Sequence, residues 1–281
     1  MKIIDGISRM QTMVKIIKKE GKSIGFVPTM GYLHDGHASL ARSARAHTDV
    51  VVMSIFVNPL QFGPSEDFNR YPRDFARDED IARRAGVDII FYPKKEEMYP
   101  ARYCTYVDVE GLASGLCGAS RPGHFRGVTT VVAKLFLIVK PDMAYFGQKD
   151  AQQAIVIKRM VEDLNMGIDV KILPIVREKD GLAMSSRNVY LSKVERADAA
   201  VLYESLKKAG EMIEGGERDP KKVINAMSDM IKTKPSMRVD YISIVEAKTL
   251  KEVDAISGEV LAALAVFAGN TRLVDNVILK A

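Results

Sequence analysis

The segment Phe26-Val27-Pro28-Thr29-Met30-Gly31-Tyr32-Leu33-His34-Asp35-Gly36-His37 runs from a short apolar strand through a turn into the start of a helix. Its last four residues form a His-x-Gly-His motif, which chance rarely produces in a chain with 4 histidines. A helix start offers N–H groups and a positive dipole to an anion, and Gly36 lets a phosphate approach the backbone closely. Two imidazoles there can donate hydrogen bonds to oxygens that gain charge as pyrophosphate leaves. The alternative is that His34 and His37 only cap the helix or fill the core.

Strand and helix patterns alternate on both sides of this segment. Apolar runs predict strands at 23–28, 49–57, 87–91, 143–146 and 169–175. Helical spacing predicts helices at 38–46, 75–85, 129–139 and 150–164. This order predicts an α/β fold, a Rossmann-like and mostly parallel sheet with helices on both faces. Ligands of such sheets bind beyond the carboxyl ends of the strands, where the motifs of this chain lie.

The pattern changes after about residue 187. Two helices are expected at 192–210 and 220–232, followed by strands at 239–245, 259–267 and 272–278. Helices followed by a run of strands predict a small α+β domain. We therefore expect two domains, at 1–186 and 187–281.

The composition is that of a globular protein, with 47% hydrophobic and 27% charged residues. The N-terminal residues lack the apolar core of a signal peptide, and the longest apolar run, Val260 to Ala268, is too short to span a bilayer. The net charge of +5 is scattered and forms no tract for RNA or DNA. We therefore expect a cytoplasmic protein with no membrane or nucleic-acid partner. Cys104 and Cys117 are expected to be reduced thiols, with a disulfide or metal site as the alternative.

A second motif, Ala183-Met184-Ser185-Ser186-Arg187-Asn188, places hydroxyl residues beside an arginine on a loop after a strand. Such residues suit a triphosphate clamp, although an ordinary polar loop between domains would look the same. Class I aminoacyl-tRNA synthetases and the related nucleotidylyltransferases pair His-x-Gly-His with a Met-Ser motif to bind ATP, and this chain resembles them. Ala183 and Ser186 stand where the synthetases have lysines, so the cation must come from Arg187 or elsewhere.

The segment GQKDAQQ, residues 147–153, follows another predicted strand. Lys149 can reach a phosphate as a mobile charge. Asp150 can accept hydrogen bonds from ribose hydroxyls, or it only caps the next helix. Gln153 would lie one turn into that helix and face the same crevice.

Two more segments carry candidate polar groups. Gln61, within Asn58-Pro59-Leu60-Gln61-Phe62, can donate to a carboxylate and accept from a hydroxyl without adding charge, or it is a turn residue. His124 lies in RPGHFRG, residues 121–127, which is either a mobile loop at the active site or a structural turn.

Together these segments resemble the pantothenate synthetase (pantoate–β-alanine ligase) family along nearly the whole chain. The matching stretches are PTMGYLHDGH (28–37), NPLQFGP (58–64), YPRD (71–74), RPGHFRGV (121–128), YFGQKDAQQ (145–153) and AMSSRN (183–188). The resemblance implies a nucleotidylyltransferase-type N-terminal domain, a smaller C-terminal lid domain and a homodimer. It also implies Mg²⁺-dependent condensation of pantoate with β-alanine, in which ATP yields AMP and pyrophosphate through a pantoyl adenylate.

The resemblance also implies roles for individual residues. The catalytic residues would be His34, His37, Lys149 and Arg187. The ATP-binding residues would be Met30, Gly31, Tyr32, Leu33, His34, Asp35, Gly36, His37, Gly147, Gln148, Lys149, Asp150, Val176, Met184, Ser185, Ser186 and Arg187. Gln61 and Gln153 would bind pantoate, and Gln61 also β-alanine. Gln148 departs from the glutamate common in the family, and no residue is assigned to Mg²⁺ or to the base that deprotonates β-alanine.

Two other functions stay open on the sequence. One is a nucleotidylyltransferase that keeps AMP in its product. The other is a tRNA-binding synthetase relative or an RNA-binding module, which would need an RNA-binding surface within the roughly 95 residues that follow Ser186.

Overall fold

The computed structural model describes residues 1–64 and 66–281, and their contacts divide the chain into two compact units. The first unit comprises Met1–Ala113, Arg121–Gly147 and Gln153–Pro174. The second comprises Ser114–Ser120, Gln148–Gln152 and Ile175–Ala281. This division differs from the expected boundary near Ser186, and the functions assigned to the two domains stay predictions.

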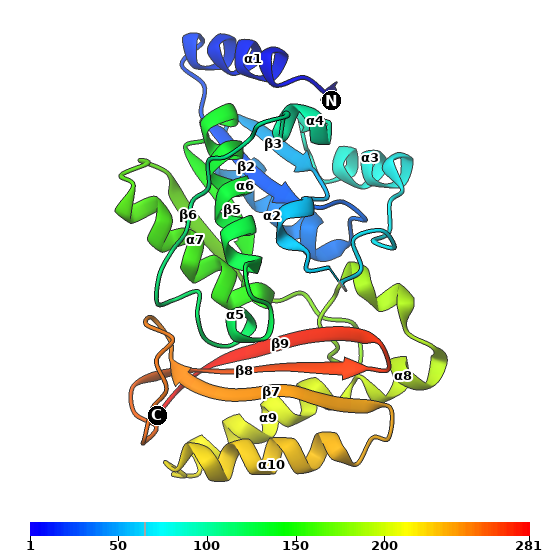
Figure 1. The fold of residues 1–281 in the computed structure, drawn as a ribbon, viewed down its shortest axis with the longest axis vertical. Coiled ribbons are helices and arrows are strands. Elements are labelled where there is room, and N and C mark those ends of the chain that lie inside the picture. The colour runs from blue at the N-terminus through cyan, green and yellow to red at the C-terminus, as the bar shows by residue number, and fades with distance from the viewer. Residues whose placement is uncertain (65) are drawn as a thin grey trace. The chain divides into compact units, whose positions relative to one another are not determined.

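The first unit is built on a six-stranded sheet (Figure 1). Its strands are β1 (Lys2–Ile4), β2 (Ile24–Thr29), β3 (Val50–Ile55), β4 (Ile89–Phe91), β5 (Met143–Gly147) and β6 (Asp169–Leu173). All neighbours pair in parallel, in the order β1-β4-β3-β2-β5-β6. After β2 the chain adds β3 and β4 on one side, then returns to place β5 and β6 on the other. The Rossmann-like prediction is confirmed, and the loop after β2 lies at the switch point where such sheets bind ligands.

Helices cover both faces of this sheet. The helical segments that lie wholly in the first unit are α1 (Ile7–Lys19), α2 (Asp35–His47), the 3-10 turn η1 (Pro59–Gln61), α3 (Phe75–Arg84), α4 (Lys95–Met98) and α6 (His124–Val139). A further helix, α7 (Ala151–Asp163), runs mainly within it. On one face of β2, the ring of Phe26 meets Phe136 of α6 at 6.3 Å between centroids. On the other face, Gly25 lies so close to α2 that a Cβ would sit 2.5 Å from the Thr48 hydroxyl.

The second unit has a three-stranded antiparallel sheet in the order β7-β8-β9, backed by two helices (Figure 1). Its elements are α5 (Cys117–Ser120), the 3-10 turns η2 (Gln148–Asp150) and η3 (Ser186–Tyr190), α8 (Lys193–Asp198), α9 (Val201–Glu214), α10 (Pro220–Lys232), β7 (Met237–Glu246), β8 (Glu259–Ala268) and β9 (Thr271–Lys280). Apolar residues of α9 and α10, such as Leu206 and Ile231, form one core with Val260 and Leu264 of β8. The predicted α+β character of this part is confirmed.

Several details differ from the sequence-based expectation; for example, α1 was not predicted and α6 begins five residues earlier than the predicted helix. The single helix predicted at 192–210 is wrong, because α8 and α9 meet at Ala199 and Ala200. There the N–H of Leu202 donates to the carbonyl of Ala199, three residues back, which tightens the turn. Alanines favour helices, so the sequence carries no sign of this break. Strand β1 was not predicted, since three residues are too few to show alternation.

Both cysteines are free thiols, as expected.

Within the described residues, the helices are all too short or too polar to cross a membrane.

Candidate active site

One buried carboxylate holds the loop that follows β2. Asp78 of α3 is 1% exposed, and its two oxygens accept hydrogen bonds from the N–H groups of Tyr32 and Leu33, at 2.8 and 2.6 Å. Gly31 has a φ of 85°, and a Cβ there would lie 2.9 Å from the Asp78 carboxylate. The carboxylate and the glycine therefore fix the course of the backbone into α2.

Burial raises the pKa of Asp78, although the two N–H groups and the Arg77 guanidinium, 4.0 Å away, favour its ionised form. The same guanidinium lies over the Tyr32 ring, at 4.6 Å from its centroid. Sequence reasoning missed Asp78. The available signal was its position on the buried face of the predicted helix, four residues before Ala82.

His34 and His37 begin α2 and cap it reciprocally. The Nδ1 of His34 accepts from the N–H of Gly36 at 3.2 Å, and the Nδ1 of His37 accepts from the N–H of His34 at 3.3 Å. Because each Nδ1 is an acceptor, the proton of each neutral ring lies on Nε2. Capping therefore does not compete with the predicted role, since it uses Nδ1 and fixes Nε2–H as the donor.

The side chain of Gln61 is oriented by neighbours on both sides. Its Oε1 accepts from the Asn58 amide at 3.1 Å, and its Nε2 lies 3.0 Å from the Met30 sulfur. A thioether is a weak acceptor, so a substrate oxygen can replace it at Nε2 with a gain in hydrogen bonding. Met30 and Gln61, predicted to bind ATP and pantoate respectively, are thus brought into direct contact.

Asn58 is the residue that fixes Gln61, and sequence reasoning assigned it no role. Its side chain is buried, with Oδ1 accepting from the Tyr99 hydroxyl at 2.7 Å and Nδ2 donating to the Gly127 carbonyl at 3.1 Å. Burial raises the pKa of Tyr99, which keeps its hydroxyl a donor. A Cβ on Gly127 would lie 2.2 Å from the Leu60 carbonyl oxygen, so only glycine allows α6 to lie this close to η1.

The segment around His124 packs against the backbone of Gln61, and its role, left open by the sequence, stays a prediction. The Nδ1 of His124 lies 2.8 Å from the Gln61 carbonyl and must donate to it, so Nε2 accepts from Arg121 at 3.0 Å. Arg121 also forms a two-point ion pair with Glu66, at 2.7 and 2.5 Å. Burial alone would raise the pKa of Glu66, but the Arg121 hydrogen bond and charge hold it below its usual value.

In the second unit, the predicted ATP residues lie on a hairpin and on η2. The N–H of Met184 donates to the Val176 carbonyl at 3.0 Å, and the Ser185 hydroxyl caps η3 by accepting from the N–H of Arg187 at 3.2 Å. Lys149 lies in η2, with its ammonium 3.6 Å from the Asp150 carboxylate. In the first unit, Gln153 is half-buried in the first turn of α7.

The described residues form no group of three or more His, Cys, Asp or Glu side chains able to hold a metal. Mg²⁺ at nucleotide sites is bound mainly through phosphates and water, with one or two carboxylates. A Mg²⁺ ion that arrives with ATP therefore needs no such group.

The first unit has a parallel sheet with a topological switch point, and a helix there begins with two imidazole donors. These features define an α/β protein of the Rossmann-like, nucleotide-binding class. The family model "Pantoate-beta-alanine ligase" matches residues 2–278. The chain belongs to the pantoate–β-alanine ligase family, as the sequence motifs predicted.

Similar proteins cover the whole chain. The pantothenate synthetase of Moorella thermoacetica is 59% identical over 280 residues, covering 100% of this chain and 99% of the relative. The crystal structure of pantothenate synthetase from Thermus thermophilus is 44% identical, covers 100% of both chains and has a TM-score of 0.95. That of pantoate–β-alanine ligase from Francisella tularensis, complexed with "Beta-gamma ATP" and β-alanine, is 33% identical, covers 99% of this chain and 97% of its own, and has a TM-score of 0.83.

The loop held by Asp78 can be tested with Asp78→Asn. The amide has one acceptor for two N–H groups, so we expect the free energy of unfolding to fall by about 1–3 kcal/mol. We also expect kcat of the ligase reaction to fall at least about tenfold, because the displaced loop carries Met30 and leads into α2. Urea unfolding and steady-state kinetics measure the two effects. The matched control is Asp80→Asn, an exposed carboxylate on the same helix; equal behaviour of the two variants would refute the role of Asp78.

The two functions of His34 can be separated by substitution. Asparagine is a good N-cap, so His34→Asn should keep the free energy of unfolding within about 0.5 kcal/mol while removing the Nε2 donor. We expect kcat to fall about 10²-fold or more, by analogy with oxyanion-hole donors. His34→Ala should lose the same activity and about 1 kcal/mol of stability as well. His47→Asn at the other end of α2 serves as the control, and full activity of His34→Asn would leave His34 a cap alone.

Proposed function

We propose that this protein condenses pantoate with β-alanine to form pantothenate, using ATP and releasing AMP and pyrophosphate. Membership in the pantoate–β-alanine ligase family over residues 2–278 carries the proposal. The relatives named above support the proposal, because each of them matches this chain along nearly its full length. The contact between Met30 and Gln61 agrees with it, since ATP and pantoate must meet for the carboxylate to be activated.

The first step is adenylation of pantoate. A carboxylate and an ammonium ion do not condense in water, because neither is reactive when ionised. In the proposed step a carboxylate oxygen attacks the α-phosphorus of ATP in line, and the bond to pyrophosphate breaks. The Nε2–H groups of His34 and His37 donate to oxygens that gain charge, and Lys149 and Arg187 supply positive charge. Each preorganised donor contributes about 2.7–4 kcal/mol, and holding the reactants together about 7–11 kcal/mol.

The other ATP-binding residues predicted above keep their roles in this proposal. Gln61 and Gln153 bind pantoate through neutral amides, which can donate hydrogen bonds to its carboxylate without repelling it. Gln61 also contacts β-alanine.

The second step forms the amide. The deprotonated amine of β-alanine attacks the acyl carbon of the adenylate, the C–N bond forms, AMP leaves with the bonding electrons, and the amine loses a proton. Water must be excluded while the adenylate exists. We propose that residues 187–281 act as the lid for this purpose. A homodimer, a Mg²⁺ requirement and a cytoplasmic location complete the proposal as the resemblance implies them.

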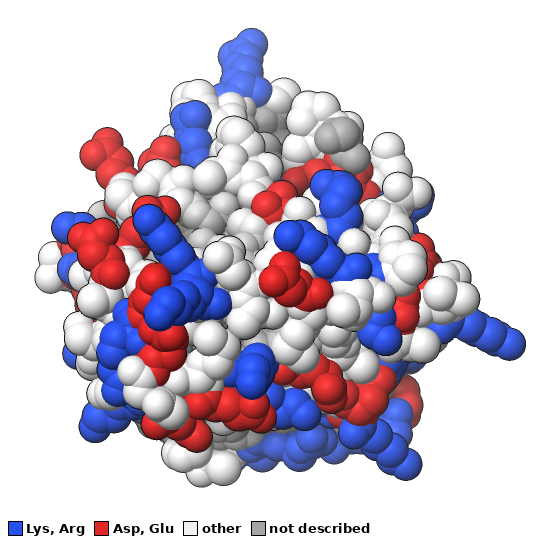
Figure 2. Space-filling view, turned by 90° about the horizontal axis from the view of Figure 1, so that it is seen from below, with Lys and Arg blue, Asp and Glu red and all other residues white. Residues whose placement is uncertain are grey.

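The alternative of an RNA-binding protein needs a continuous basic surface. On the face seen in Figure 2, the described lysines and arginines are interspersed with aspartates and glutamates. Over most of that face this mixture offers no extended basic track, and basic side chains gather only along its lower edge (Figure 2).

Reaction order gives a direct test of the two-step scheme. Because the adenylate forms before the amine is needed, pantoate alone should support exchange of labelled pyrophosphate into ATP. Addition of β-alanine should then release free AMP in equal amount to pantothenate. An exchange that requires β-alanine would rule out the scheme, and pyrophosphate without free AMP would favour a nucleotidylyltransferase that keeps AMP in its product.

The substrate read by Gln61 can be tested with Gln61→Glu. This change nearly preserves shape but places a negative charge where the pantoate carboxylate is proposed to bind. We expect the KM for pantoate to rise at least about tenfold, a loss of about 1.4 kcal/mol, while the KM for ATP stays within about twofold. Gln153→Glu should behave in the same way, and Gln11→Glu, exposed on α1, provides the matched control. Equal rises in the KM for pantoate and the KM for ATP would show that Gln61 does not bind pantoate specifically.

A further inference from the structure

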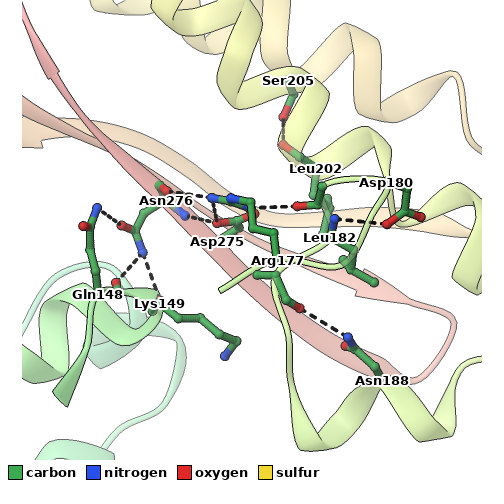
Figure 3. Close-up of polar contacts among 12 residues, drawn as sticks. Gln148, Lys149, Arg177, Asp180, Leu182, Asn188, Leu202, Ser205, Asp275 and Asn276 are labelled. Carbon is green, nitrogen blue, oxygen red and sulfur yellow. Dashed lines mark hydrogen bonds and ion pairs between the residues drawn. The ribbon is translucent and has the colours of Figure 1, made fainter. Parts of the chain in front are cut away.

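Two successive residues of the last strand connect both predicted ATP segments of the second unit. Asp275 and Asn276 lie in the middle of β9, and both are nearly inaccessible to solvent, at 2% and 3% exposed. A polar pair buried in a strand must be satisfied by hydrogen bonds. Its partners are the η2 turn on one side and the hairpin before η3 on the other (Figure 3).

Asn276 holds the backbone of η2. Its Nδ2 donates to the carbonyls of Gln148 and Lys149, at 2.9 Å each, and its Oδ1 accepts from the Gln148 side chain at 3.3 Å. Two carbonyls bonded to one amide fix the orientation of the turn as well as its position. The direction in which the Lys149 side chain leaves the backbone is thereby set from a strand more than a hundred residues later in the chain.

Asp275 holds the hairpin that leads to the Met-Ser motif. Its carboxylate forms a two-point ion pair with Arg177, at 2.6 and 2.9 Å, and accepts from the N–H of Asn276 at 2.7 Å. Arg177 donates in addition to the Gly181 carbonyl at 3.0 Å, and its guanidinium lies 3.9 Å from the centroid of the Tyr203 ring. Burial raises the pKa of Asp275, although Arg177, the Asn276 N–H and the nearby Lys149 ammonium favour its ionised form.

We propose that Asp275 and Asn276 are positioning residues, which set the Lys149 ammonium and the 176–187 hairpin in a fixed relation for handling the triphosphate of ATP. The inference rests on the proposed function, in which Lys149 and Arg187 supply charge to ATP. Neither β9 residue touches the reacting atoms in this scheme. Each acts through the backbone or side chain it holds, so a single rigid dipeptide aligns two cationic groups that lie 38 residues apart in sequence.

The decisive variant is Asn276→Asp. It preserves the shape of the side chain but replaces two donated hydrogen bonds with repulsion between a carboxylate and two carbonyl oxygens. We expect the Kd for ATP to rise, or kcat of pantoate-dependent pyrophosphate exchange to fall, at least about tenfold, as loss of buried hydrogen bonds predicts. The Kd for pantoate should stay within about twofold. Asn276→Ala removes the donors without adding charge and should shift the same quantities, which keeps the test available if the aspartate variant does not fold.

A control for lost stability is Ile231→Ala, in the fully buried core of the same unit. It should lower Tm by a similar or greater amount while leaving the Kd for ATP and exchange kcat within about twofold of wild type. The positioning role is wrong if the Asn276 variants behave like Ile231→Ala. Calorimetric titration with a non-hydrolysable ATP analogue separates this inference from the proposed function, because it needs no pantoate. A wild type that binds ATP but supports no exchange would overturn the proposed function. The role of Asn276 would then still be decided by comparing the Kd for the ATP analogue between the variants and the wild type.

Discussion

The carboxylate of Asp78 makes two short hydrogen bonds to successive N–H groups, and the geometry of the first unit's site depends on them. An ionised carboxylate is costly to bury, so it is stable here only while both N–H groups face it. That requirement holds the backbone at Tyr32 and Leu33 and so determines where α2 begins. The same loop carries Met30 to the amide of Gln61. The loop is therefore shaped by the protein itself, before a substrate supplies any contact.

Hydrogen-bond partners divide the histidines into two kinds. His34 and His37 accept backbone N–H groups at Nδ1, which assigns the proton to Nε2. His124 donates from Nδ1 to the Gln61 carbonyl and accepts from Arg121 at Nε2, so both of its nitrogens bond to other protein groups. The same residue type therefore provides proposed ligand donors at the helix start and a fixed support beneath Gln61. Which ring nitrogen carries the proton is therefore set by the groups that surround each histidine.

Strand β9 joins the separate segments of the second unit. Strand β9 supplies the groups that hold the η2 turn, although η2 directly follows a strand of the first unit's sheet. Contacts consequently assign Gln148–Gln152 to the second unit, while the residues on either side belong to the first. The sequence predicted Lys149 in a domain ending at Ser186, because a change in the pattern of helices and strands marks a boundary only at one point along the chain. A hydrogen bond between residues 127 positions apart leaves no local trace in composition or periodicity.

The sequence by itself determined the parallel sheet, the small α+β unit and the family. Apolar periodicity reports burial, and the motifs GYLHDGH (31–37) and GQKDAQQ (147–153) are local enough to be read directly. It also indicated His34, His37 and Gln61 as candidates, since their residue types and positions after strands carry chemical meaning. Only the tertiary structure showed which residues hold these segments in place. Asp78 holds the loop before α2, Asn58 and His124 hold Gln61, and the Asp275–Asn276 pair holds the η2 turn and the hairpin before η3. These residues act through contacts between distant segments, and a buried polar side chain looks the same in sequence as an exposed one until its partners are known.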